Sequence, residues 1–419
     1  MLDRTVQPTL KNIDKINFYE PQKLQLNNSI PFFLMQAKPQ SLVRLQVVFS
    51  AGTSTHTCSL IPSLAIEMLK EGTQNKTNKV LIEAFDLWGA YLDIEINQEK
   101  ACLVIHVLEI HLAKILPLVY EILTQSVFPE KSFNTLLSNK KEIYILNQEK
   151  IKNKANHIFS STIFKNTPYA SNYTLETFST VTLEEVKTYS QQFHQLSNAF
   201  IAVAGGLHNP LELINNYLGN IQSDFKYSST EIVLSNKEAT IYEPIKDSTQ
   251  TALEIGKFTI NRKHEDYHKL AIGNILFGGY FGSRLMSNIR EDKGYTYGVY
   301  SYLTSIGGVS LLKIATEVGS VQKEDAIKEI YKELDLLKNE LVSIDELKLV
   351  CNYILGSLLK NVEGNFEAMD LFLSLYYKGN DYTYYDKYIA TLNTITPQDL
   401  IPIYQKYLNT TNLLNVSVG

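Results

Sequence analysis

Two segments of this 419-residue chain are versions of one another. Residues 178–205, FSTVTLEEVKTYSQQFHQLSNAFIAVAG, align without a gap with residues 392–419, LNTITPQDLIPIYQKYLNTTNLLNVSVG. The offset is a constant 214 residues, the separation of Gly205 from Gly419. A repeat of half the chain length predicts two similar domains, usually related by an approximate twofold axis.

Both copies of the repeat have the same order of local signals. Thr182 and Thr396 each precede a helical pattern as an N-cap, and a polar turn with Asn198 or Asn412 leads into an apolar strand. Elsewhere, groups of β-branched strands come before long helices in each half, as in residues 90–108. We therefore predict an α+β fold of two homologous sandwich domains that arose by internal duplication. The expected domains are residues 1–222 and 236–419, with a polar linker near residues 219–239.

Composition excludes several classes of protein. The net charge is −5, and Lys and Arg are dispersed among Asp and Glu, so we expect no nucleic-acid partner. No apolar run reaches the roughly 18 residues of a membrane helix, and no signal peptide is evident at the N-terminus. Three scattered cysteines argue against a disulfide framework. These features favour a cytoplasmic protein that does not bind membranes.

The densest motif is ILFGGYFGSRLMSNIREDKGYTYGVYSYL, residues 275–303. A helix is expected to end at Gly278-Gly279, and a second to stop before Gly294, with a strand following. The segments GSRL, IRE and GYTY resemble the pitrilysin/insulinase family of inverted zinc metallopeptidases, which includes the mitochondrial processing peptidase. EMLKEGT, residues 67–73, also stands where that family has HMLFKGT. The resemblance implies a processing-peptidase-like metallohydrolase fold.

The resemblance also locates the family's zinc site, an inverted His-x-x-Glu-His helix. Its positions on this chain are Ser63, Ile66 and Glu67, so both ligand histidines and the general-base glutamate are replaced. A third family ligand, a glutamate roughly 75 residues further on, corresponds to Glu142 or Glu149. One carboxylate cannot hold zinc without the imidazoles, and Ile66 cannot take a proton from water. We therefore expect no metal or other cofactor in this chain.

A second zinc-like pattern is HEDYH, residues 264–268. The spacing of His264 and His268 would suit a zinc helix with Glu265 as base, and a self-contained zinc enzyme of this kind is one alternative. However, the pentapeptide falls at the start of an expected helix, where the macrodipole favours acidic residues. The family also has a similar "hpDyy"-like start at this point. The match is therefore interpreted as accidental.

Arg290 and Tyr297 are the remaining candidates for catalysis and substrate binding. In the family, these residues face the zinc across a substrate chamber. A guanidinium can donate to a peptide carbonyl, and a phenol can donate to a developing oxyanion. The resemblance thus implies a zinc-free subunit that supplies both residues to a homologous, zinc-bearing partner acting on extended peptides.

The same residues also have an interpretation in which their role is only structural. Arg290 would pair with Glu291 or Asp292 on the surface, and Tyr297 would only pack in a strand. The chain would then be a catalytically inactive scaffold or assembly subunit of the same fold.

Overall fold

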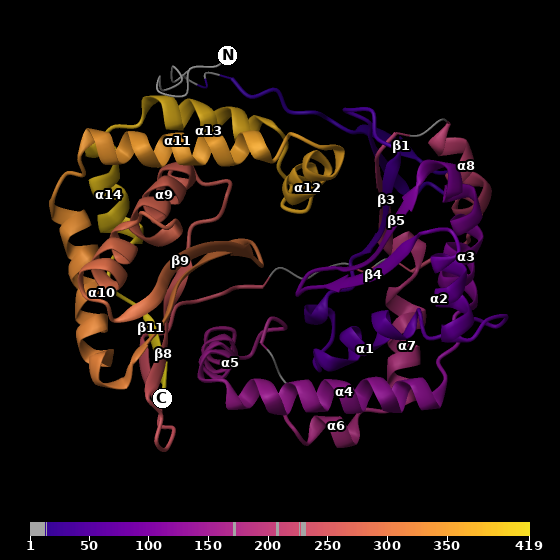
Figure 1. Ribbon diagram of the computed structural model, residues 1–419, viewed down its shortest axis with the longest axis horizontal. Coiled ribbons are helices and arrows are strands. Elements are labelled where there is room, and N and C mark those ends of the chain that lie inside the picture. Colours follow the sequence, from indigo (N-terminus) through magenta and orange to yellow (C-terminus); the bar gives the residue numbers. More distant parts are fainter. Residues whose placement is uncertain (1–12, 14, 171–172, 207–208, 226, 228–231) are drawn as a thin grey trace, which may run out of the picture.

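The structure is a computed structural model that describes residues 13, 15–170, 173–206, 209–225, 227 and 232–419. Two β-sheets lie in the two halves of the chain, each accompanied by helices (Figure 1). This mixture of helices and sheets confirms the α+β prediction. Part of the expected linker, residues 226 and 228–231, lies outside the described residues, and the domain bounds stay a prediction.

The first sheet has six strands within the described residues, in the order β1-β2-β6-β3-β5-β4, and the second has five, in the order β7-β11-β8-β10-β9. The orders match strand by strand once β1 is left out. The β2–β6 and β7–β11 pairs are parallel and the other pairs antiparallel. The strands are β1 Gln22–Gln25, β2 Pro31–Met35, β3 Leu42–Phe49, β4 Tyr91–Ile96, β5 Ala101–Leu108, β6 Ala199–Ala204, β7 Ala239–Glu243, β8 Gln250–Thr259, β9 Thr296–Ile306, β10 Val309–Gly319 and β11 Leu414–Val418.

The helices repeat in the same way. Helices α4 and α11 begin 214 residues apart, as do α7 and α14. In the first half they are α1 Leu60–Met68, α2 Asn78–Asp86, α3 Leu112–Gln125, α4 Glu130–Glu149, α5 Ile151–Ile163, α6 Thr177–Thr180, α7 Leu183–Phe193 and α8 Pro210–Leu218. In the second half they are α9 Tyr267–Asn274, α10 Lys323–Asn339, α11 Ile344–Lys360, α12 Asn365–Tyr376, α13 Thr383–Thr394 and α14 Pro397–Tyr407. Two π-helical segments, η4 Ile275–Gly279 and η5 Met286–Asp292, follow α9. Short 3-10 turns occupy Thr53–Thr55, Glu109–His111, Leu196–Asn198 and Ser320–Gln322.

The two helices that start the aligned segments begin with capping boxes. The Thr182 backbone N–H donates to Glu185 Oε2 over 2.8 Å, and the Glu185 N–H donates back to the Thr182 hydroxyl. Thr396 and Asp399 form the same box at the start of α14. Each box satisfies donors that a helix N-terminus leaves free, which stabilises the helix by about 1 kcal/mol. Both predicted N-caps are confirmed.

One helix from each half packs against the sheet of the other half. Helix α5, from the first half, packs Ala155 and Phe159 against β8 and β11, and α12, from the second half, packs Met369 and Phe372 against β2 and β6. The first residues of α5 and α12 are again 214 positions apart. Ion pairs and hydrogen bonds reinforce both contacts, for example Arg44 to Asp370 at 2.6 Å. The halves are therefore interlocked, so neither predicted sequence range contains all the helices that cover its own sheet.

Within the described residues, we find no helix with the length and apolar character needed to span a bilayer.

Candidate functional site

The helix at the expected zinc position carries an ion pair. Ser63 and Glu67 are four residues apart on α1, so their side chains share one face. Lys140 reaches this face from α4, with its ammonium nitrogen 2.6 Å from Glu67 Oε1 and 2.8 Å from Ser63 Oγ. An ammonium thus lies between the two side chains that stand at the family's histidine positions.

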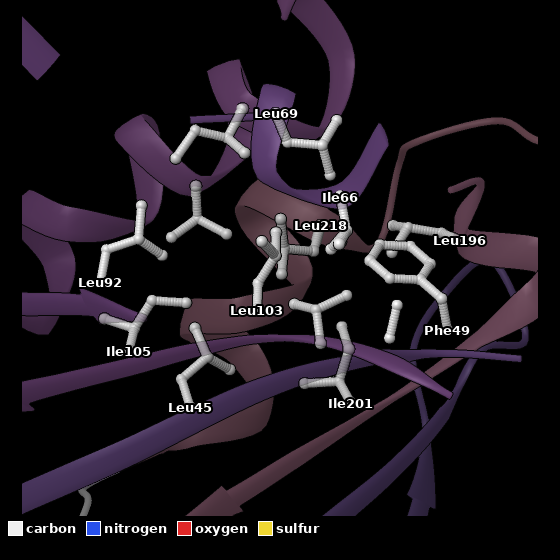
Figure 2. Close-up of a cluster of buried hydrophobic side chains, with 14 of the residues drawn as sticks. Leu45, Phe49, Ile66, Leu69, Leu92, Leu103, Ile105, Leu196, Ile201 and Leu218 are labelled. Carbon is white, nitrogen blue, oxygen red and sulfur yellow. The ribbon is translucent and has the colours of Figure 1, made fainter. Parts of the chain in front are cut away.

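Ile66 occupies the general-base position of the same helix. Its side chain is fully buried in the core between α1 and the first sheet, where Figure 2 shows it together with Phe49 and Leu103. No water or substrate can reach a side chain in this position.

The candidates for the third family ligand do not join Ser63 and Glu67. Glu142 and Glu149 are both exposed on α4. Glu142 is two residues after Lys140, which turns it roughly 200° around the helix axis from the ammonium. Among the described residues, no three His, Cys, Asp or Glu side chains converge in a way that could hold a metal ion. A hydroxyl and a carboxylate already paired with a lysine do not fit zinc.

A cavity of about 720 Å³ adjoins this ion pair. Ser63 and Lys140 form part of its wall, and most of the remainder is polar but uncharged. His157 lines this cavity, and its Nε2 has no hydrogen-bond partner in the part of the chain that the structure describes. Burial lowers the pKa of this imidazole. Other lining residues include Gln98, Tyr144, Asn147, Gln148, Asn153, Asn156, Tyr169 and Tyr173.

Tyr297 lies beside a second cavity of about 500 Å³. It is the second residue of the edge strand β9, and its side chain is 94% exposed. Tyr300 and Tyr302 continue along the same wall, with the Lys313–Glu254 ion pair also lining the cavity. Burial raises the pKa of the Glu254 carboxyl, and the Lys313 ammonium opposes that rise.

The two cavities meet at α5. Asn153 and Asn156 on α5 line both of them, so this helix, which packs against the second sheet, forms their common wall. The cavity beside Ser63 and Lys140 and the cavity beside Tyr297 therefore adjoin at this helix.

Arg290 lies on η5 and is not among the residues lining either cavity. Its guanidinium carbon is 4.3 Å from the centroid of the Phe281 ring, and its Nη1 is buried with no hydrogen-bond partner among the described residues. The ion pairs found among the described residues include none between Arg290 and Glu291 or Asp292. The chain turns between Arg290 and Tyr297 at Gly294, whose φ of +66° is the left-handed conformation that glycine tolerates best.

The structure does not bring His264 and His268 together as a zinc helix. Helix α9 begins at Tyr267, so His264 precedes it and accepts a hydrogen bond from the Asp266 N–H over 3.1 Å. His268 is buried, with its ring stacked on Tyr388 at a centroid distance of 5.1 Å and tilted against Tyr384 at 4.6 Å. Burial, with a smaller contribution from Lys387, lowers the pKa of His268 to about 4.

Lys140 is the site residue that the sequence prediction missed. It follows Glu67 by 73 positions, close to the interval expected for the third ligand. That interval was a usable signal, but a search for acidic side chains passes over a lysine.

Comparison with known proteins agrees with this geometry. Residues 180–353 match the family model described as the peptidase M16 inactive domain. The chain is 25% identical over 312 residues to the uncharacterized zinc protease YmxG of Bacillus subtilis, covering 72% of this chain and 74% of that protein. It is 23% identical over 310 residues to the non-peptidase homolog YmxG of Helicobacter pylori, covering 71% and 70%. A crystal structure of a peptidase M16 inactive domain from Pseudomonas fluorescens has the same fold, with a TM-score of 0.85, 21% identity and coverage of 95% and 98%.

Proposed function

Because the chain is an inactive-type member of the M16 (pitrilysin/insulinase) peptidase family, we propose that it is the metal-free subunit of a zinc endopeptidase complex. In this role it pairs with a homologous subunit that carries the inverted zinc motif, and it contributes Tyr297 and Arg290 to the handling of extended peptides. On its own it hydrolyses no peptide.

The observation that carries the proposal is the contrast between the two halves of the site. At the metal position, the Lys140 ammonium already neutralises Glu67 and Ile66 is buried, so the first half is closed to hydrolytic chemistry. In the second half, Tyr297 is 94% exposed beside a cavity, where its phenol is free to donate to a ligand. A large aromatic side chain exposed to this degree keeps apolar surface in contact with water, which is unfavourable in free energy. A binding partner or substrate that covers the ring would remove this penalty.

The edge strands support an extended substrate. β4 and β9 end the two sheets, and each has one edge without a strand partner among the described residues. Both lie toward the middle of the molecule, between the two halves (Figure 1). An extended peptide could add to such an edge through main-chain hydrogen bonds, and Tyr297 stands on β9 itself.

The proposal is tested by reconstitution. The purified chain is mixed with a homologous subunit that has an intact His-x-x-Glu-His motif, and hydrolysis of a quenched fluorescent peptide is followed. The proposal expects activity only from the mixture. A pair that assembles and cleaves at the same rate with Tyr297→Phe and with Arg290→Ala would instead indicate a scaffold subunit.

A further inference from the structure

Within the described parts of the chain, Arg290 contacts an aromatic ring and no carboxylate. Its guanidinium lies over Phe281, with 4.3 Å between the guanidinium carbon and the ring centroid. Arg284, six residues earlier, has the opposite arrangement, because its Nε and Nη2 donate to the two oxygens of Glu346, each over 2.8 Å. The two arginines of one motif thus have different partners, and only Arg284 has its donors committed to an acid.

Phe281 is an exposed residue in an anchored segment. Its side chain is 58% exposed, so core packing does not determine the ring position. The residues around it are anchored: Tyr280 packs against Tyr353 with ring centroids 5.1 Å apart, and the fully buried Ser283 donates its N–H to the Tyr280 carbonyl. The ring is therefore presented to Arg290 from a short, well-anchored segment.

The chemistry of this contact differs from that of an ion pair. An aromatic face attracts a guanidinium through its quadrupole but accepts no strong hydrogen bond. The guanidinium keeps its full charge and its N–H donors, and its orientation is restricted before any ligand arrives. A carboxylate at the same place would occupy two donors and neutralise the charge.

We propose that Phe281 is a positioning residue that holds the Arg290 guanidinium ready to bind a main-chain carbonyl of the peptide substrate. This inference rests on the proposed function only in its choice of ligand for Arg290. The positioning itself is a property of the isolated chain, and Arg290 is the residue that touches the substrate.

The chain offers a matched control in Tyr242. The Lys323 ammonium lies 4.1 Å from the centroid of its ring, so Tyr242→Leu removes a cation–π contact of similar geometry on β7, at the opposite edge of the second sheet from β9. The Phe281→Trp variant keeps an aromatic face, whereas Phe281→Leu keeps apolar bulk alone. Thermal unfolding of every variant identifies any loss of fold.

Kinetics of the reconstituted complex provide the first measurement. Phe281→Leu should raise KM about two- to fivefold with kcat unchanged, the range expected from losing one exposed cation–π contact. Phe281→Trp and Tyr242→Leu should leave KM at the wild-type value. In an Arg290→Ala background, Phe281→Leu should have no further effect, because it acts through Arg290. If Phe281→Leu raised KM by the same factor in the Arg290→Ala background, the inference would be overturned.

Arginine side-chain NMR of the chain alone provides the second. The sequence has only five arginines, so the Nε–Hε resonance of Arg290 can be assigned from the Arg290→Lys spectrum. We expect a ring-current shift of this resonance in wild type that disappears in Phe281→Leu and persists in Tyr242→Leu. An unchanged resonance in Phe281→Leu would refute positioning. If the resonance moves but Arg290→Ala is kinetically silent, the proposed function fails and the positioning contact stands.

Discussion

Replacing Lys140 with Met tests whether its ammonium stabilises the chain by neutralising Glu67, which stands at the position of a zinc ligand in the family. The Lys140 and Glu67 side chains are 21% and 27% exposed, and their charged atoms are 2.6 Å apart. Exposed ion pairs contribute up to about 1 kcal/mol, and breaking a fully buried pair costs about 3–5 kcal/mol. For this partly buried pair we expect Lys140→Met to lower the free energy of unfolding by about 2 kcal/mol, because Glu67 loses the ammonium that lies 2.6 Å from its carboxylate.

The double variant separates the charge effect from packing. Lys140→Met combined with Glu67→Leu removes both charges, so it should cost less than Lys140→Met alone. Lys79→Met is the matched control, since Lys79 and Glu83 are 3.8 Å apart and 84% and 62% exposed, and its effect should be about 0.3 kcal/mol. Urea unfolding followed by circular dichroism measures all three. A Lys140→Met effect no larger than that of Lys79→Met would refute the reasoning.

Two further predictions concern metal and pH. The purified chain should contain no stoichiometric zinc by elemental analysis, and about one zinc per chain that is lost in His264→Ala and His268→Ala would contradict this. Because His268 has a folded-state pKa of about 4, below its ordinary 6.5, the unfolded chain takes up the proton first as the pH falls. Stability from this group should be complete above pH 6.5 and fall by up to about 3 kcal/mol by pH 4, and unfolding of His268→Phe should lack that part of the pH dependence.

The features that could be predicted from the sequence are those encoded locally. The capping residues Thr182 and Thr396 and the strand patterns repeat at a fixed offset, so the duplication and the fold class could be recognised before any contact was known. The same holds for the replaced zinc positions, because Ser63, Ile66 and Glu67 lie within two turns of one helix.

The features that could not be predicted depend on contacts between distant segments. Nothing local to α5 specifies that Phe159 packs on the other half's sheet, since its apolar face would suit either sheet. The Lys140–Glu67 contact spans 73 residues and depends on how α4 crosses α1. The partner of Arg290 was also missed, because acidic neighbours in sequence were considered and the exposed ring of Phe281 was not.

The most direct test of the central claim is the turnover of the reconstituted pair with Tyr297→Phe. The exposed phenol is proposed to donate to the oxygen that becomes negative during peptide hydrolysis, and losing one such donor costs about 3 kcal/mol, on the order of a hundredfold in rate. We predict that kcat falls by about this factor while assembly with the zinc-bearing subunit and KM stay near wild type. A wild-type kcat in Tyr297→Phe would contradict a catalytic contribution from this chain.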